Sequence, residues 1–255
     1  MAQLLIYKTA VPITRARHGD SFVELSGDYT FSGEVNSVPL MAVEFPQAAS
    51  EYAIVFAGDG DEVLPAVILG VRGNENLFLT DAKGWQAKYI PAFVRRYPFV
   101  FSRSGDRFVL CVDEEFPGFN REGRGQRLFG EDGNPSPYVD RVLTFLQEYQ
   151  AQFRRTQRFC ARVKELGLLE PMQAQVTVDA GTRLSLGGFM AVNREKLKAL
   201  TGDVLADLAK TDELELLYLH LQSMRNFDGL RDRLEHTLSQ QKDNAAAAEE
   251  PASVH

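Results

Sequence analysis

The sequence has few of the residues from which metal, redox and disulfide sites are built. Its 255 residues include two cysteines, four histidines and one tryptophan. Cys111 and Cys160 form no CxxC pair and no zinc set, so we expect two reduced thiols, with a single disulfide as the alternative. The sequence therefore predicts no bound cofactor.

Long apolar runs and excess positive charge are also missing. No stretch approaches the roughly 20 apolar residues that cross a bilayer, and the N-terminus lacks the basic and apolar regions of a secretory signal. The formal net charge is −7, whereas nucleic-acid-binding domains usually carry a basic face. We therefore predict a soluble, cytoplasmic protein that neither inserts into membranes nor binds nucleic acid.

The N-terminal half reads as a set of short strands. β-branched and aromatic runs alternate with Gly-Asp and Gly-Asn separators that suit tight turns. These runs are SFVEL, AVEFP, YAIVFAG, PAVILGV, LFLT and RFVLCVD. The separators are too short for helical crossovers, so we predict a bent or barrel-like antiparallel sheet. Residues 85–97 are the exception, because aromatic residues at four-residue steps there predict a short helix.

The C-terminal half reads as helical around one hairpin. Ser136 and Pro137 suit the start of a long helix that ends at Gly167. A hairpin with its turn at Ala180–Gly181 follows, and then come helices that begin near Asn193 and Thr211. We predict the α+β class, with a single domain over residues 1–239 and a disordered tail over residues 240–255.

Catalytic patterns are weak. His18 and Asp20 with a distant His220 would make a two-histidine, one-carboxylate iron site, but the spacing is common by chance, and two surface histidines are the simpler interpretation. Neither a GxSxG elbow nor a P-loop is present. The acidic set Asp113, Glu114, Glu115, Glu131 and Asp132 lacks calcium-loop spacing, which favours a solvated surface over a cation site. A non-catalytic protein is favoured.

One stretch concentrates rings and cations. GWQAKYIPAFVRRYPF, residues 84–99, holds the single tryptophan and an arginine pair, and a glycine-rich loop follows at residues 116–137. Together they could form a groove for a peptide or an aromatic molecule, with core packing as the alternative. The predicted ligand-binding residues are Trp85, Tyr89, Phe93, Arg95, Arg96, Tyr97, Phe119, Arg124 and Arg127.

Several blocks resemble the bacterial SapC family, which is distinct from the transporter permease of the same name. They are NSVPLMAVEFPQAASEYAIVF (36–56), YIPAFVRRYPFVF (89–101), LCVDEEFPGF (110–119), GQRLFGEDGNPSPYVDRVLTFLQEY (125–149) and the region 187–224. The resemblance spans residues 5 to 235 and implies no reaction and no catalytic residue. The family's name implies a link to the bacterial surface layer.

The resemblance also implies a set of partners. Members are commonly encoded near flavin-dependent halogenase-like enzymes, cupin-like proteins and TonB-dependent receptors. This setting suggests an accessory protein that binds a peptide, a receptor segment or a partner enzyme. Two alternatives stay open: a metal-dependent enzyme that uses His18, Asp20 and His220, and a structural protein of the surface layer.

Overall fold

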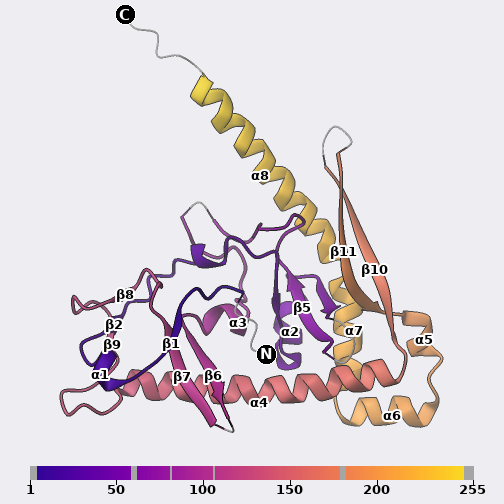
Figure 1. The fold of residues 1–255 in the computed structure, drawn as a ribbon. Coiled ribbons are helices and arrows are strands. Elements are labelled where there is room, and N and C mark those ends of the chain that lie inside the picture. Colours follow the sequence, from indigo (N-terminus) through magenta and orange to yellow (C-terminus); the bar gives the residue numbers. More distant parts are fainter. Residues whose placement is uncertain (1–4, 59–61, 81, 106, 179–181, 250–255) are drawn as a thin grey trace, which may run out of the picture.

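The computed structural model describes residues 5–58, 62–80, 82–105, 107–178 and 182–249 (Figure 1). Its strands form three antiparallel sheets, which confirms the α+β class and the antiparallel pairing. No closed barrel occurs within these residues, so the barrel-like alternative is wrong. The strands are too short and too divided among separate sheets to close on themselves.

The sheets divide the molecule into regions. The first has the order β1 (Ala10–Pro12), β7 (Arg107–Asp113), β6 (Phe99–Ser104). A small sheet has the order β8 (Phe119–Asn120), β2 (Phe22–Val23), β9 (Gln126–Arg127). The largest has the order β10 (Leu169–Val178), β11 (Thr182–Val192), β4 (Ile54–Ala57), β5 (Leu64–Ile68), β3 (Ser37–Pro39).

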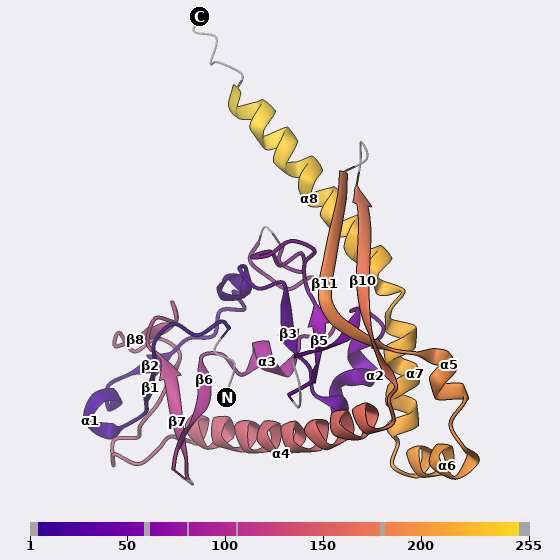
Figure 2. The same cartoon turned by 45° about the vertical axis from the view of Figure 1, so that its right-hand side comes forward.

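The long helix α4 (Pro137–Glu165) runs beneath the first and largest sheets (Figures 1 and 2). Its start is confirmed: the Ser136 hydroxyl accepts a hydrogen bond from the backbone N–H of Val139 at 3.4 Å, and Pro137 opens the first turn. Gly167 follows its end with a φ of +64°. The buried face packs the Phe159 ring 6.2 Å from that of Phe45.

The remaining helices are short, apart from α8. They are α1 (Arg15–His18), η1 (Thr30–Ser32), η2 (Ala42–Glu44), α2 (Phe45–Ala48), α3 (Ala92–Arg95), α5 (Arg194–Lys198), α6 (Gly202–Lys210), α7 (Glu213–Ser223) and α8 (Asn226–Glu249). None of the helices in the described ranges has an apolar stretch long enough to span a membrane.

AVEFP is not a strand but lies in η2 and α2. The buried Glu44 side chain bends back to accept a hydrogen bond from the Met41 backbone N–H at 2.7 Å. This bond closes a helical turn at the point where the apolar pattern had predicted an extended chain. A buried carboxylate that satisfies the backbone thus overrides β propensity.

The predicted helix over residues 85–97 shrinks to α3, which Pro91 precedes as its cap. The backbone N–H groups before it bond elsewhere: Gln86 donates to the Phe78 carbonyl, and Tyr89 donates to the Glu51 carboxylate at 2.9 Å. Because these N–H groups bond to residues outside the segment, no helical turn forms before Pro91.

Only one of the two helix starts predicted after the hairpin matches the structure. Asn193 caps α5 as predicted, because its side chain accepts from the Lys196 backbone N–H. Thr211 instead ends α6, where its hydroxyl donates to the Asp207 carbonyl at 3.1 Å. Asp212 then turns the chain with a φ of +60° before α7 begins.

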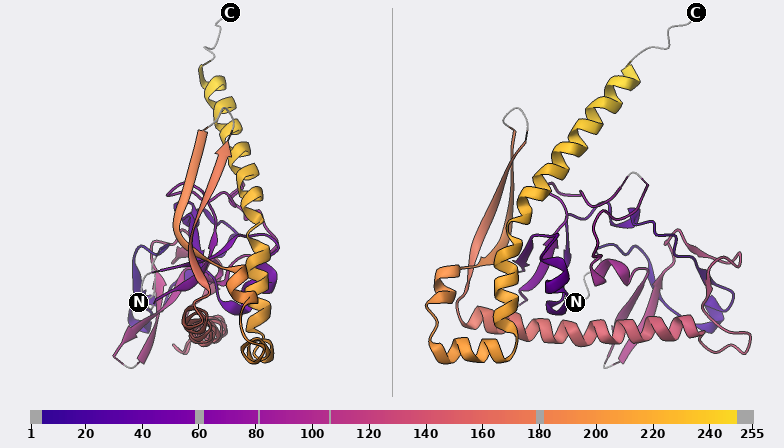
Figure 3. Two further views of the ribbon diagram at one scale, coloured as in Figure 1. Left: turned by 90° about the vertical axis from the view of Figure 1, so that its right-hand side faces the viewer. Right: turned by 180° about the vertical axis from the view of Figure 1, so that it is seen from behind.

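The hairpin of β10 and β11 and the helix α8 extend away from the rest of the chain, as all views show (Figures 1 to 3). We call these three elements the arm and the remainder the body. The predicted turn at residues 180–181 lies outside the described residues. Helix α8 continues past residue 240, where a tail had been expected, to Glu249, and residues 250–255 lie outside the described residues.

Candidate functional site

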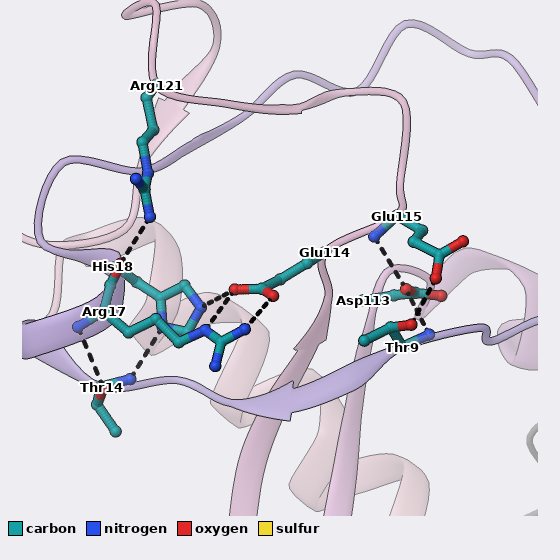
Figure 4. Close-up of polar contacts among 8 residues, drawn as sticks. All are labelled: Thr9, Thr14, Arg17, His18, Asp113, Glu114, Glu115 and Arg121. Carbon is teal, nitrogen blue, oxygen red and sulfur yellow. Dashed lines mark hydrogen bonds and ion pairs between the residues drawn. The ribbon is translucent and has the colours of Figure 1, made fainter.

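Three consecutive acidic residues, Asp113 to Glu115, lie at the end of β7 and form hydrogen bonds with the N-terminal segment (Figure 4). We call them the acidic triplet. Asp113 is fully buried, and its carboxylate accepts hydrogen bonds from the backbone N–H groups of Lys8 (2.8 Å), Thr9 (3.0 Å) and Glu115 (3.1 Å). The Tyr97 hydroxyl also donates to it at 3.3 Å. One carboxylate therefore positions three segments of the chain.

The other two members have separate partners (Figure 4). Glu114 accepts from the Arg17 guanidinium at 2.7 Å, and this bond lowers the pKa of the Glu114 carboxyl. The buried His18 ring lies 3.1 Å from the same carboxylate and accepts from the Thr14 backbone N–H through Nδ1, so its proton is on Nε2. The Glu115 carboxylate accepts from the Thr9 hydroxyl. The triplet is thus a bonded network in which Asp113 is buried, Glu114 is half-buried and Glu115 is exposed.

A cavity of about 320 Å³ lies beside this network. The N-terminal segment, the chain after β2, η1, Tyr97 and the loop after β7 supply its walls. Its size is at the lower end for ligand sites, which suits one large side chain better than a dinucleotide or a flavin.

Aromatic rings form the apolar part of the wall. The Phe31 ring stacks on Tyr97 with centroids 4.2 Å apart, and Phe116 meets Tyr97 edge-on at 5.4 Å. Burial and the Asp113 charge raise the pKa of the Tyr97 hydroxyl, which therefore stays protonated and donates to Asp113. The rings are held before any ligand arrives.

Carboxylates form the polar part of the wall. Glu24, Asp28 and Glu115 line the cavity together with one cation, Lys8. Hydrogen bonds from the Thr30 hydroxyl and backbone N–H lower the pKa of Asp28, so this carboxylate is ionised at neutral pH.

Two cations outside the cavity offset part of this charge. Arg124 lies 3.7 Å from Glu24, and Lys83 lies 3.6 Å from Asp28. Both pairs are long and exposed, so water and competing ligands can displace them at little cost.

Gly118 holds the two halves of the wall together. The Glu24 backbone N–H donates to the Gly118 carbonyl at 2.9 Å. A Cβ on Gly118 would lie 2.0 Å from the Glu24 carbonyl oxygen and 2.6 Å from the Phe116 ring. Only glycine therefore permits this close approach between the loop and the end of β2.

The nine predicted ligand-binding residues do not share one surface. Tyr97 alone among them lines the cavity, and Arg124 reaches its rim through Glu24. Phe93 is buried in the core, and Arg96 is buried with its guanidinium 4.2 Å from the centre of the Phe93 ring. Their expected roles in ligand binding stay predictions.

The other members belong to different environments. Trp85 donates to the Tyr52 hydroxyl at 2.7 Å, and Tyr89 donates to the buried Glu44 carboxylate at 2.6 Å. Arg95 is exposed and lies over the rings of Tyr89 and Phe145. The last two are Phe119, whose ring lies 5.9 Å from that of His18, and Arg127 in β9. The stretch 84–99 thus packs mainly inside the body.

The histidine and carboxylate set is not assembled. Both histidines, expected at the surface, are fully buried. His220 bridges the Ile54 carbonyl at 2.8 Å and the Val192 backbone N–H at 3.0 Å, whereas His18 binds Glu114 and Thr14. Across the described residues, no group of three His, Cys, Asp or Glu side chains is placed to hold a metal ion. Cys111 and Cys160 are buried and free.

Comparison with known sequences settles the family. The sequence model of SapC matches residues 13–230. The chain belongs to the SapC family. No curated protein and no solved structure matches this SapC-family chain. The match covers the acidic triplet and most of the residues around the cavity, including Glu24, Tyr97 and Gly118.

Sequence reasoning missed most of the cavity of this SapC-family protein. Asp113 carried one available signal, since an aspartate where a strand gives way to a turn can accept from the backbone N–H two residues further on. Glu24 and Asp28 carried none, because their role depends on the approach of the loop around Gly118 from far along the chain.

Proposed function

We propose that this SapC-family protein is a non-catalytic accessory protein that binds an exposed segment of a protein partner. The cavity beside the acidic triplet receives one arginine side chain of that segment. The observation that carries this proposal is the combination of a preformed ring wall with three carboxylates in a space of about 320 Å³.

The chemistry of the walls selects the ligand. A guanidinium is planar, stacks on aromatic faces and donates to several carboxylate oxygens at once. Phe31 and Phe116 offer the faces, and Glu24 and Asp28 offer the acceptors. An anionic ligand would be repelled by these carboxylates, and a purely apolar ligand would bury them without offering a further hydrogen-bond donor.

A binding role also agrees with the residues available. None of the described residues that line the cavity is a histidine or a cysteine, and Tyr97 is fixed by Asp113. We propose that the partner is a protein encoded nearby, with a flavin halogenase-like enzyme or a TonB-dependent receptor as the first candidates.

The test compares two peptides that differ only in charge. Acetyl-Gly-Arg-Gly-amide is titrated into isotope-labelled protein and followed by amide NMR shifts, with the citrulline peptide as the neutral match. We expect the arginine peptide to shift amides at Lys8, Glu24–Thr30 and Glu115–Gly118, with weak saturable binding that salt reduces. The citrulline peptide should bind at least about tenfold more weakly, because it lacks the charge.

A matched pair of double variants locates the site. Glu24→Gln with Glu115→Gln should abolish the arginine preference. Glu131→Gln with Glu148→Gln removes the same charge from exposed positions that do not line the cavity and should retain it. Equal shifts from both peptides, or equal loss in both variants, would refute the proposal.

A further inference from the structure

The outer strand of the largest sheet has one free edge. β10 pairs with β11 along its length, and within the described part of the chain no strand pairs with its other side. The arm carries this edge away from the small sheet of β2, β8 and β9, which lies at the opposite end of the body (Figures 1 and 3). An edge strand presents backbone N–H and C=O groups that can pair with another chain.

Features that hinder pairing of this edge with another strand are confined to the first half of β10. Glu170 and Pro171 stand near the start of β10, and the register shifts between Met172 and Ala174. Charge, proline and bulges are the features with which proteins block edge pairing. The segment AQVTV, residues 174–178, has no charge and no proline, and its register with β11 is regular.

The two faces of this segment differ. Ala174 and Val176 are buried, and helix α8 contacts β10. Gln175 and Thr177 point to the opposite, exposed face. The segment is therefore an ordered amphipathic strand with one face already covered and one edge unpaired.

This segment is complementary to itself. In an antiparallel pair centred on Val176, Gln175 lies opposite Thr177 of the second copy, and Val176 lies opposite Val176. In such a pair the exposed face of one strand continues as the exposed face of the other, so polar side chains lie opposite polar side chains. Both α8 helices then lie on the same side of the joined sheet. No like charges oppose each other. A strand of different sequence would need its own matching alternation, whereas a second copy has it by symmetry.

We propose that the protein forms a two-fold symmetric dimer by antiparallel pairing of β10 with β10 of a second copy. The pairing joins the two largest sheets into one and occupies the free edges. The cavities beside the acidic triplets lie at the far ends of the two bodies and stay accessible, so the dimer would present two arginine-binding cavities to a partner.

Charge variants on the exposed face test the register. Gln175→Lys with Thr177→Lys places lysine opposite lysine twice and should raise the dimer dissociation constant by about tenfold. Gln175→Glu with Thr177→Glu should do the same. Sedimentation equilibrium of the full chain measures both, with the wild type expected to dimerise as its concentration rises.

Mixing the two variants supplies the control for folding. In a mixed dimer every lysine faces a glutamate, so the equimolar mixture should form dimers at concentrations at which each variant alone is largely monomeric. A wild type that stays monomeric at its solubility limit would overturn the proposal. So would a double-lysine variant that dimerises like the wild type, since another surface would then hold the dimer, or a mixture that stays monomeric.

Discussion

The body and the arm are stabilised in different ways. In the body, chain segments are held by buried polar side chains that each bind several backbone groups, as Asp113 and Glu44 do. His220 of the body acts in the same way, since it bonds the backbone of β4 and of the end of β11 where the arm joins the body. In the arm, the ribbon of β10 and β11 packs an apolar face against α8 and leaves its other face to water. The body therefore depends on a few individual atoms, whereas the arm depends on a continuous apolar surface.

This difference decides where substitutions do damage. A buried carboxylate with four donors cannot be replaced without leaving those donors unsatisfied, and each orphaned donor costs about 1–3 kcal/mol. An exposed side chain of the β10–β11 hairpin makes few contacts, so its replacement changes the free energy of unfolding only slightly. The predictions below test this contrast from the largest effect to the smallest.

Loss of Asp113 should have the largest effect. Asp113→Ala removes the acceptor of three backbone N–H groups and the Tyr97 hydroxyl, and we expect the free energy of unfolding to fall by about 4 kcal/mol. Urea denaturation followed by tryptophan fluorescence measures it. Asp20→Ala, at an exposed aspartate, is the matched control and should change little. A loss below about 1 kcal/mol in Asp113→Ala would contradict the role of this residue.

His220 should make the body sensitive to acid. Burial lowers its pKa from 6.5 to about 4, so between these values the unfolded chain binds a proton that the folded chain does not. The contribution of His220 to the free energy of unfolding is therefore fully present above pH 6.5 and falls by about 3 kcal/mol as the pH drops to 4.

Two variants isolate this contribution. His220→Gln should be less stable at neutral pH but should lose this part of the slope between pH 6.5 and 4. His236→Gln, at an exposed histidine of α8, should retain the wild-type slope. Stability curves measured by urea denaturation at several pH values decide between them. An unchanged slope in His220→Gln would show that other groups cause the acid sensitivity.

Local signals predicted the fold where they agreed with tertiary structure. Ser136, Pro137 and Gly167 marked the ends of α4 because caps act through the adjacent backbone alone. AVEFP and residues 85–97 were misassigned because Glu44 and Glu51 bind backbone groups there, which no local pattern encodes. Tyr97 lies in the cavity wall, and the carboxylates of that wall come from segments that only folding brings together, so no local pattern could indicate them.

The cap of α4 offers a smaller effect in the body. Ser136→Ala removes the hydroxyl that accepts from Val139 and donates to the Arg127 carbonyl, and should cost about 1 kcal/mol. The exposed Ser239 donates to the Glu235 carbonyl within α8, so Ser239→Ala is the same chemical change without a cap. Thermal melts of the two variants give the comparison, and equal shifts would mean that the cap contributes nothing.

The arm should show the smallest effect on stability. At concentrations below the dimer range, Gln175→Lys with Thr177→Lys should change the free energy of unfolding by less than about 1 kcal/mol, since both side chains face water. The same variant is expected to weaken the dimer, so stability and assembly should separate. Val176→Ala, on the buried face, should cost more than both lysines together, because it removes contacts with the apolar surface that holds the ribbon. If the exposed lysines cost more than the buried truncation, the arm depends on its polar face, and the contrast with the body fails.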